Sequence, residues 1–260
     1  MRSTIRRQSP LITTYIDDIR YPTIEERVSK GKEVANRIGN FVHYAGVSIF
    51  YYAMFYDQEN LPNCMGGKYD CSKLLTDFPF PQYPLAIPHL KTYYLFQLGA
   101  NIYKLGYQIF FLKDDPKFYE FALHHFLTTF LIGFSFLIHA LKMGSFIMLF
   151  HDFSDTFFLF SRIYYELKGK SLWILIPINL CSLITWCYCR LYVLPICSLQ
   201  TLYFGPHFHA DWPFVNDYFS VLWLEISMLT ILFLMNIIWT YLILNGLGSM
   251  YAKSLGKKNK

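Results

Sequence analysis

Residues 118–141 read FYEFALHHFLTTFLIGFSFLIHAL, an almost unbroken apolar run in which Glu120 carries the only formal charge. A helix rises 1.5 Å per residue, so about 20 helical residues cross the roughly 30 Å hydrocarbon core of a bilayer. The run does not alternate between apolar and polar residues, which argues against a β-strand. It therefore predicts a membrane-spanning helix.

The composition of the whole chain agrees with this prediction. Of 260 residues, 54% are hydrophobic and 20% aromatic. Only 16% are charged, against roughly 25% in soluble domains. The net charge of +5 does not indicate nucleic-acid binding, because the basic residues gather at the two ends and in short loops rather than on one face. We expect a polytopic membrane protein.

Six segments are suited to crossing a membrane, so we expect an all-α bundle with about six transmembrane helices. They cover residues 38–56, 90–112, 118–141, 143–167, 172–194 and 218–244. Lys and Arg concentrate before the first segment, after the second and fourth, and after the last. By the positive-inside rule, both termini face the cytosol. The expected organisation is a basic cytosolic segment over 1–33, a transmembrane domain over 34–245 and a basic cytosolic tail over 246–260.

The two ends of the chain give different indications of which organelle membrane holds the protein. Residues 1–16 contain three Arg and no acidic residue, which faintly resembles a mitochondrial presequence. The last four residues, Lys257-Lys258-Asn259-Lys260, resemble the dilysine retrieval signal of endoplasmic-reticulum membrane proteins, although such a tail can also simply contact anionic lipid. We expect the endoplasmic reticulum, with the mitochondrial inner membrane as the alternative.

Polar side chains cluster within two of the apolar segments. His124 and His125 are each followed one turn later by a threonine, Thr128 and Thr129. In the next segment, one helical face collects a histidine and two carboxylates, His151, Asp152 and Asp155. Ionisable groups at membrane depth are costly, so they face the bundle interior and mark function by default.

Three interpretations of these residues remain open. The histidines can serve acyl transfer as nucleophile or general base, with a carboxylate to orient them. They can bind a metal ion, although adjacent residues on a helix point about 100° apart and do not easily share one ion. They can also form a buried packing network in which His and Asp satisfy each other.

A further polar stripe runs along residues 90–112. Gln97, Asn101, Lys104 and Gln108 recur at spacings of four, three and four, which places them on one helical face. Lys104 near mid-membrane needs a partner, for which Asp152 and Asp155 are the candidates. Alternatively, its long side chain reaches the cytosolic surface.

The six cysteines contain no zinc-binding pattern, so we expect no metal site. Cys64 and Cys71 lie in the first non-cytosolic loop, where they either form a disulfide or remain free thiols. The other four lie in or near the segment 172–194 and are interpreted as small apolar residues; they are Cys181, Cys187, Cys189 and Cys197.

At this point the pattern resembles a known family. The histidine pair His124-His125, Thr128, Ser135, Lys142-x-Gly144 and Leu149-x-His151-Asp152-x-Ser154-Asp155 resemble the Lag1 motif of ceramide synthases in the TLC (TRAM, Lag1, CLN8) domain family. An upstream run over 83–98, with Tyr83-Pro84-Leu85 and Gln97-Leu98, resembles the same enzymes. The resemblance covers about residues 34–202. It implies an enzyme that joins a fatty acyl-CoA to the amine of a sphingoid base.

The resemblance also implies which residues act. The catalytic candidates are His124, His125, His151, Asp152 and Asp155, and the substrate-binding candidates are Gln97, Asn101, Lys104, Thr128 and Ser154. No cofactor is implied beyond acyl-CoA as co-substrate. The chain departs from the family where His139 replaces an Asn, Lys142 an Arg and Leu159 a Glu.

Two hypotheses from different classes follow. The first is a ceramide synthase-like N-acyltransferase whose partners are long-chain acyl-CoA, a sphingoid base and membrane lipids, with no nucleic acid. Assembly as a homodimer or as a subunit of a membrane complex is compatible with it. The second is a non-enzymatic protein of the same fold, either a lipid-binding or trafficking factor or an accessory subunit of a membrane complex. Fold alone does not decide between them.

Overall fold

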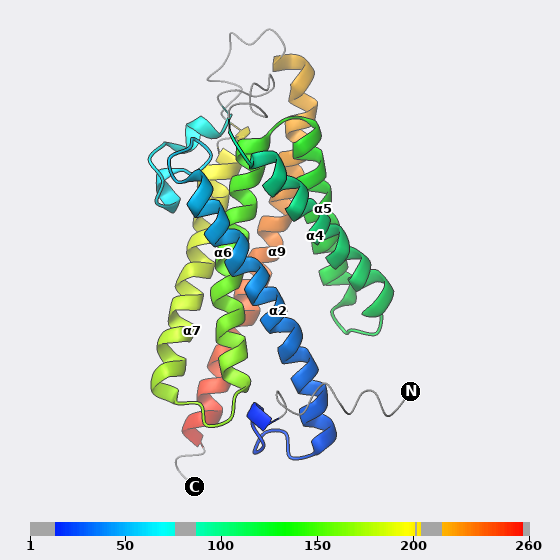
Figure 1. The fold of residues 1–260 in the computed structure, drawn as a ribbon, viewed down its shortest axis with the longest axis vertical. Coiled ribbons are helices and arrows are strands. Elements are labelled where there is room, and N and C mark those ends of the chain that lie inside the picture. Colours follow the sequence, from blue (N-terminus) through cyan, green and yellow to red (C-terminus); the bar gives the residue numbers. More distant parts are fainter. Residues whose placement is uncertain (1–13, 76–86, 201, 204–214, 257–260) are drawn as a thin grey trace. The chain divides into compact units, whose positions relative to one another are not determined.

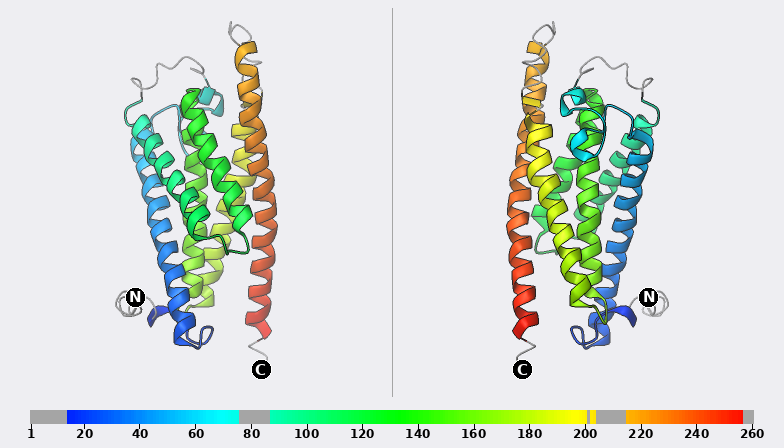
Figure 2. Two further views of the ribbon diagram at one scale, coloured as in Figure 1. Left: turned by 90° about the vertical axis from the view of Figure 1, so that its right-hand side faces the viewer. Right: turned by 90° about the vertical axis from the view of Figure 1, so that its left-hand side faces the viewer.

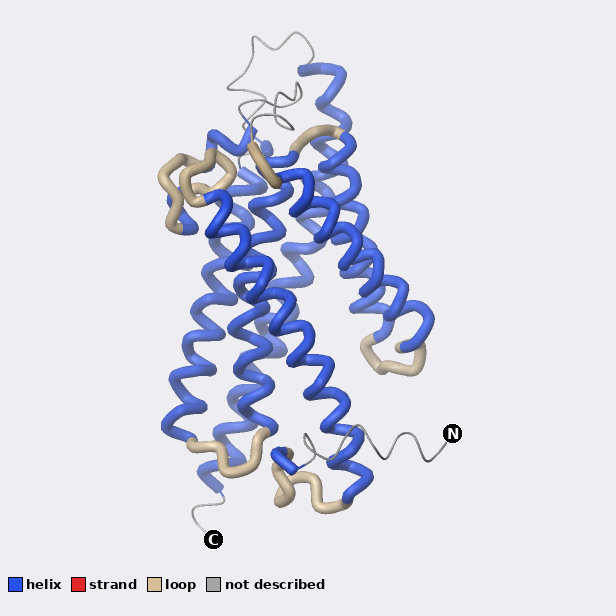
Figure 3. Tube along the Cα trace, in the orientation of Figure 1, coloured by secondary structure: helices blue, strands red, loops and turns tan. Residues whose placement is uncertain are grey.

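The computed structural model describes residues 14–75, 87–200, 202–203 and 215–256. In those residues the regular structure is helical, apart from two isolated β-bridges (Figure 3). The long α-helices are α2 (Ile24–Phe55), α4 (Leu90–Phe111), α5 (Phe118–Leu137), α6 (Leu141–Glu166), α7 (Leu172–Cys187) and α9 (Val215–Gly256) (Figure 1). The all-α class predicted from the sequence is confirmed.

Five of the helices begin within three residues of the predicted positions, but α2 begins fourteen residues before the predicted residue 38. Its start is a capping box. The Glu26 N–H donates to Thr23 Oγ1 at 3.2 Å, and the Thr23 N–H donates to Glu26 Oε2 at 3.1 Å. A polar helical stretch therefore precedes the apolar part of α2, and a search for apolar length does not detect it.

Three helices are long and apolar enough to cross a membrane by length and composition, counted over the described residues. They are Phe118–Leu137, Leu172–Leu199 and Ser220–Ser249. The second combines α7 with the π-helical segment η3 (Tyr188–Leu199), and the third lies within the single long helix α9 (Figure 2). The chain is an integral membrane protein, while six crossings with both termini in the cytosol stay a prediction.

The chain divides into two compact units. Unit 1 comprises residues 1–53 and 149–189, and unit 2 comprises residues 54–148 and 190–260. The first therefore holds most of α2, most of α6 and α7. The second holds α4, α5, most of η3 and α9, together with the end of α2 and the first turns of α6.

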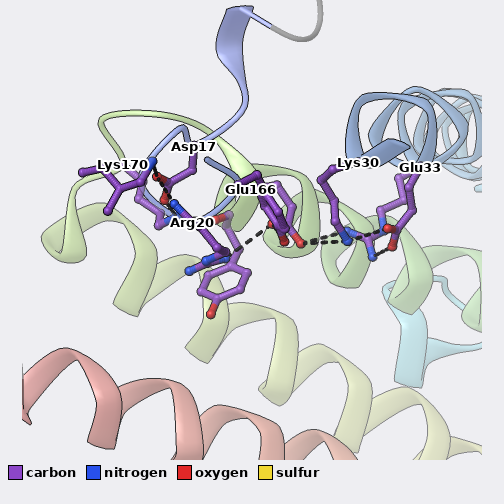
Figure 4. Close-up of polar contacts among 10 residues, drawn as sticks. Asp17, Arg20, Lys30, Glu33, Glu166 and Lys170 are labelled. Atoms are coloured by element: carbon purple, nitrogen blue, oxygen red, sulfur yellow. Dashed lines mark hydrogen bonds and ion pairs between the residues drawn. The ribbon is translucent and has the colours of Figure 1, made fainter. Parts of the chain in front are cut away.

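Unit 1 is closed at one end by ion pairs around the buried carboxylate of Glu166, the last residue of α6 (Figure 4). Arg20 and Arg37 approach it at 3.4 Å and 3.5 Å, and Lys30 lies 3.9 Å away. Beside them, Asp17 accepts a hydrogen bond from Lys170 at 2.7 Å. The chain before α2 is thus attached to the α6–α7 turn, which agrees with the prediction that both lie on one side of the membrane.

The Asp17 carboxyl illustrates how these pairs work. Partial burial alone would raise its pKa, but the hydrogen bond and the positive charge of Lys170 outweigh that effect and leave the pKa lowered. The carboxylate is therefore charged at neutral pH, as the ion pair requires.

In unit 2, α4 and α5 form an antiparallel hairpin through the turn 112–117 (Figures 1 and 2). A buried hydrogen bond of 2.7 Å joins Tyr94 Oη on α4 to Ser135 Oγ on α5. Gly144 in the first turn of α6 lies against this bond, because a Cβ there would overlap the Tyr94 hydroxyl oxygen and lie 2.8 Å from Ser135 Oγ. The glycine of the Lys142-x-Gly144 motif is thus needed for close packing.

We predict that Gly144→Ala destabilises the protein by about 1–3 kcal/mol, because overpacking a filled interior displaces the Tyr94 side chain. The matched control is Gly133→Ala on α5, where the new Cβ would meet only Leu98 Cδ1 at 3.8 Å. The control should leave the midpoint of thermal unfolding in detergent unchanged or raised, since alanine favours a helix. Equal midpoints for the two variants would contradict the assigned packing.

Candidate active site

The histidine pair lies in the first half of α5, within unit 2. The imidazoles of His124 and His125 have ring centroids 5.4 Å apart. The His124 ring also meets the indole of Trp239 on α9 edge to face, with centroids 5.0 Å apart. The Trp239 Nε1–H in turn donates a hydrogen bond to Glu120, one turn before His124 on α5. Trp239 therefore fixes the His124 ring and is itself held by α5.

Three polar atoms on this part of α5 are buried without a hydrogen-bond partner among the described residues. They are Nδ1 of His124, Nδ1 of His125 and Oγ1 of Thr129. The neighbouring Thr128 hydroxyl differs, because it donates to the carbonyl of His124 at 2.8 Å. A buried polar atom without a partner is unusual in a folded protein and is often explained by a catalytic role or an additional binding partner.

The predicted polar stripe on α4 lies near these histidines. Gln97 and Gln108 are buried, and Asn101 and Lys104 are half-buried. Gln97 Nε2 donates to Tyr93 Oη at 3.3 Å, and Asn101 Nδ2 donates to the Gln97 carbonyl at 2.9 Å. The helix α4, which carries Lys104, packs against α5, which carries the histidine pair. The structure therefore brings the two predicted groups of unit 2 together.

Sequence reasoning missed three buried polar residues of unit 2, which are Arg190, Asn236 and Glu225. Arg190 in η3 is only 2% exposed, and its Nη1 donates to Oδ1 of the buried Asn236 on α9 at 3.3 Å. A charged residue within an apolar segment of the sequence would have indicated Arg190. The same criterion would have indicated Glu225, which is buried on α9.

The His-Asp face of α6 belongs to unit 1. Asp152 and Ser154 are buried, while His151 and Asp155 are half-buried. The Ser154 hydroxyl donates to the His151 carbonyl at 2.9 Å. Because this face and the histidine pair lie in different units, their convergence in one cavity stays a prediction, and so does a pair between Lys104 and Asp152 or Asp155.

The structure corrects the interpretation of the cysteines. The Sγ atoms of Cys64 and Cys71 lie 3.7 Å apart, so the predicted disulfide between them is not formed in the structure. Cys197, interpreted as a small apolar residue, lies nearer to Cys64, at 3.3 Å between the Sγ atoms.

These features define an integral membrane protein of helices whose interior carries a polar cluster around two adjacent histidines. Residues 33–245 match the family model described as the TLC domain, so the chain belongs to that family. No solved structure matches the chain.

Two curated relatives carry the same name. The chain is 31% identical to ceramide synthase 4 of Bos taurus over 184 residues, which cover 69% of this chain and 43% of that protein. It is 28% identical to ceramide synthase 4 of Homo sapiens over 176 residues, covering 66% and 41%. The matched part is thus less than half the length of these relatives.

We predict that Asn236→Leu destabilises the protein by about 1–3 kcal/mol, because it removes a hydrogen-bond acceptor from the buried Arg190 guanidinium. Asn245→Leu is the matched control, since Asn245 lies on the same helix and is exposed. Thermal unfolding of both variants in one detergent measures the difference. If Asn236→Leu unfolds at the same temperature as the control, the hydrogen bond to Arg190 contributes nothing to stability.

Proposed function

We propose that this protein is a ceramide synthase-like N-acyltransferase, which transfers the acyl group of a long-chain acyl-CoA to the amine of a sphingoid base. The TLC domain and the names of the two relatives support this class of reaction. The observation that carries the proposal is the pair of enclosed Nδ1 atoms of His124 and His125, which have no partner among the described residues.

The reaction needs a base and a means of stabilising negative charge. The substrate amine attacks the thioester carbonyl, a C–N bond forms and the C–S bond breaks, and the amine proton is finally balanced by protonation of the leaving CoA thiolate. One of His124 and His125 removes the amine proton or carries the acyl group. The cations of Lys104 on α4 and Arg190 in η3, both in unit 2, would stabilise the oxyanion that develops on the carbonyl oxygen.

The remaining motif residues receive supporting roles in the same proposal. Asp152 or Asp155 orients a histidine, His151 belongs to the same group, and Ser154, Thr128, Gln97 and Asn101 help to bind the substrates. The acyl chain and the base enter from lipid, while the CoA phosphates stay in water near the basic segments 113–117 and 168–170. The same proposal includes residence in the endoplasmic reticulum, which the dilysine-like residues 257–260 support. It also allows a homodimer or membership of a larger membrane complex.

The departures from the family pattern differ in their consequences. His139 has a backbone φ of 65°, in the left-handed region where asparagine is among the favoured non-glycine residues. The Asn of the family pattern would therefore suit the same backbone conformation. Leu159 instead replaces a carboxylate on the same helix as Asp155, and this bears on how a substrate is positioned.

We predict that His124→Ala, His125→Ala, Asp152→Ala and Asp155→Ala each reduce amide formation about 100-fold or more, as expected when a general base or its orienting partner is lost. The assay supplies a series of acyl-CoAs and a sphingoid base to the protein in lipid nanodiscs. His139→Asn is the control, because it alters an exposed histidine outside the site and keeps a residue suited to its φ. Folded yield is measured beside activity, since removing a buried charged partner can destabilise by about 3–5 kcal/mol.

Full activity in both histidine variants would exclude this mechanism. If wild-type protein forms no amide with any acyl-CoA and base offered, while it copurifies with lipid or partner subunits, the non-enzymatic hypothesis replaces the proposal.

A second prediction separates substrate binding from packing. Thr129→Val removes a buried hydroxyl that has no partner among the described residues, so stability should stay equal or rise. If the hydroxyl meets a substrate, KM for the acyl-CoA or the base rises about 5- to 10-fold, as for the loss of one hydrogen bond of about 1–1.5 kcal/mol. Thr129→Ser should restore it. Unchanged KM in Thr129→Val would remove Thr129 from the substrate site.

A further inference from the structure

Three cysteine side chains meet in unit 2, away from the histidine pair in the sequence. Cys64 lies in the short 3-10 helix η1 (Asn63–Met65), Cys71 begins the 3-10 helix η2 (Cys71–Leu75), and Cys197 lies in η3. The Sγ atom of Cys64 is 3.7 Å from that of Cys71 and 3.3 Å from that of Cys197. All three sulfur atoms lie within 4.8 Å of one another.

These separations fit three ligands of one tetrahedral ion. With zinc–sulfur bonds of about 2.3 Å, two sulfur ligands at the tetrahedral angle are about 3.8 Å apart. Movements of a few tenths of an ångström up to about 1 Å would bring the three Sγ atoms to that spacing. Cys197 is buried, and Cys64 and Cys71 are half-buried, so water can reach the remaining side of the cluster.

The loop that carries Cys64 and Cys71 is rigidly built. The Asn63 N–H donates to the Tyr69 carbonyl at 2.7 Å, and the Gly67 N–H donates to the Pro62 carbonyl at 3.0 Å. Gly66 has a φ of 88°, and Gly67 lies so close to the Leu61 carbonyl that a Cβ would not fit. Backbone hydrogen bonds and close packing therefore hold the two thiols together without a covalent bond between them.

A single ion accounts for all three cysteines, whereas a disulfide accounts for two. Any disulfide formed here would leave the third thiol beside it, and Cys64 approaches both of the others to a similar distance. Soft thiolate ligands select zinc and similar ions. Three thiolates around a divalent ion give a net charge of −1, and the fourth tetrahedral position is left for water.

We propose that Cys64, Cys71 and Cys197 bind one thiophilic divalent metal ion, for which zinc is the probe. Binding forms three metal–sulfur bonds and releases three thiol protons, with no change of oxidation state. The ion would connect the loop after α2 to the end of the helical segment Leu172–Leu199. Cys64 and Cys197, which lie in these two parts, are 133 residues apart in the sequence. The site is structural and does not depend on the proposed acyl transfer.

The test measures metal in the full-length protein, purified in detergent without chelator and then equilibrated with zinc. We expect about one tightly held zinc ion per chain. Cys64→Ser, Cys71→Ser and Cys197→Ser should each lose the ion, whereas Cys181→Ser should retain it, because Cys181 is exposed on α7 and outside the cluster. Replacement of zinc by cobalt should give thiolate-to-cobalt charge-transfer absorption in wild type and in Cys181→Ser.

Two further measurements keep the proposal testable if a variant fails to fold. Chelation of wild-type protein should lower its unfolding temperature and expose three additional thiols to alkylation. A wild-type intact mass that shows a disulfide within the cluster would overturn the proposal, and so would zinc well below one ion per chain. Zinc bound equally by Cys64→Ser and Cys181→Ser would place the ion elsewhere and also exclude this site.

Discussion

The structure depends on one constraint, which is that a polar group inside a membrane helix has to find a partner away from lipid. Helices satisfy their own backbone groups, but each buried side chain needs a separate solution. In unit 2 the solutions link neighbouring helices. Tyr94 binds Ser135 across the α4–α5 hairpin, and Arg190 of η3 binds Asn236 of α9. The polar residues thereby position the helix that carries the histidine pair.

The same constraint explains how much could be predicted from the sequence. The starts of α4 and α5 follow from abrupt changes between apolar and polar residues, and both were predicted at residues 90 and 118. The predicted start of α2 was wrong because the helix begins at a capping box, formed by Thr23 and Glu26, in a polar part of the sequence. The π-helical segment could not be inferred from apolar composition, which does not register the missing N–H of Pro195 in the hydrogen-bond ladder.

The candidate site shows a similar division between local and distant information. Helical spacing sufficed to group Gln97, Asn101 and Lys104 on one face, because all three lie within two turns of α4. It could not show that Trp239, more than 100 residues later, packs against His124. Nor could it show that Cys197 lies beside Cys64. Contacts between distant segments depend on how helices pack, and a single sequence does not encode that packing in any short pattern.

The hydroxyl groups of the helices supply an internal comparison for the site. Most of those in the described helices donate to a carbonyl three or four residues earlier; examples are Ser145, Thr156, Thr185, Ser227, Thr230 and Thr240. Three helix hydroxyls are instead buried without a hydrogen-bond partner among the described residues, which are those of Thr129, Ser48 and Ser198. Of these three, Thr129 lies one turn after a histidine whose Nδ1 is also enclosed without a partner in the described residues. Since back-bonding to the helix is available to any such hydroxyl, the buried Thr129 hydroxyl without a partner supports the proposed substrate contact on this part of α5.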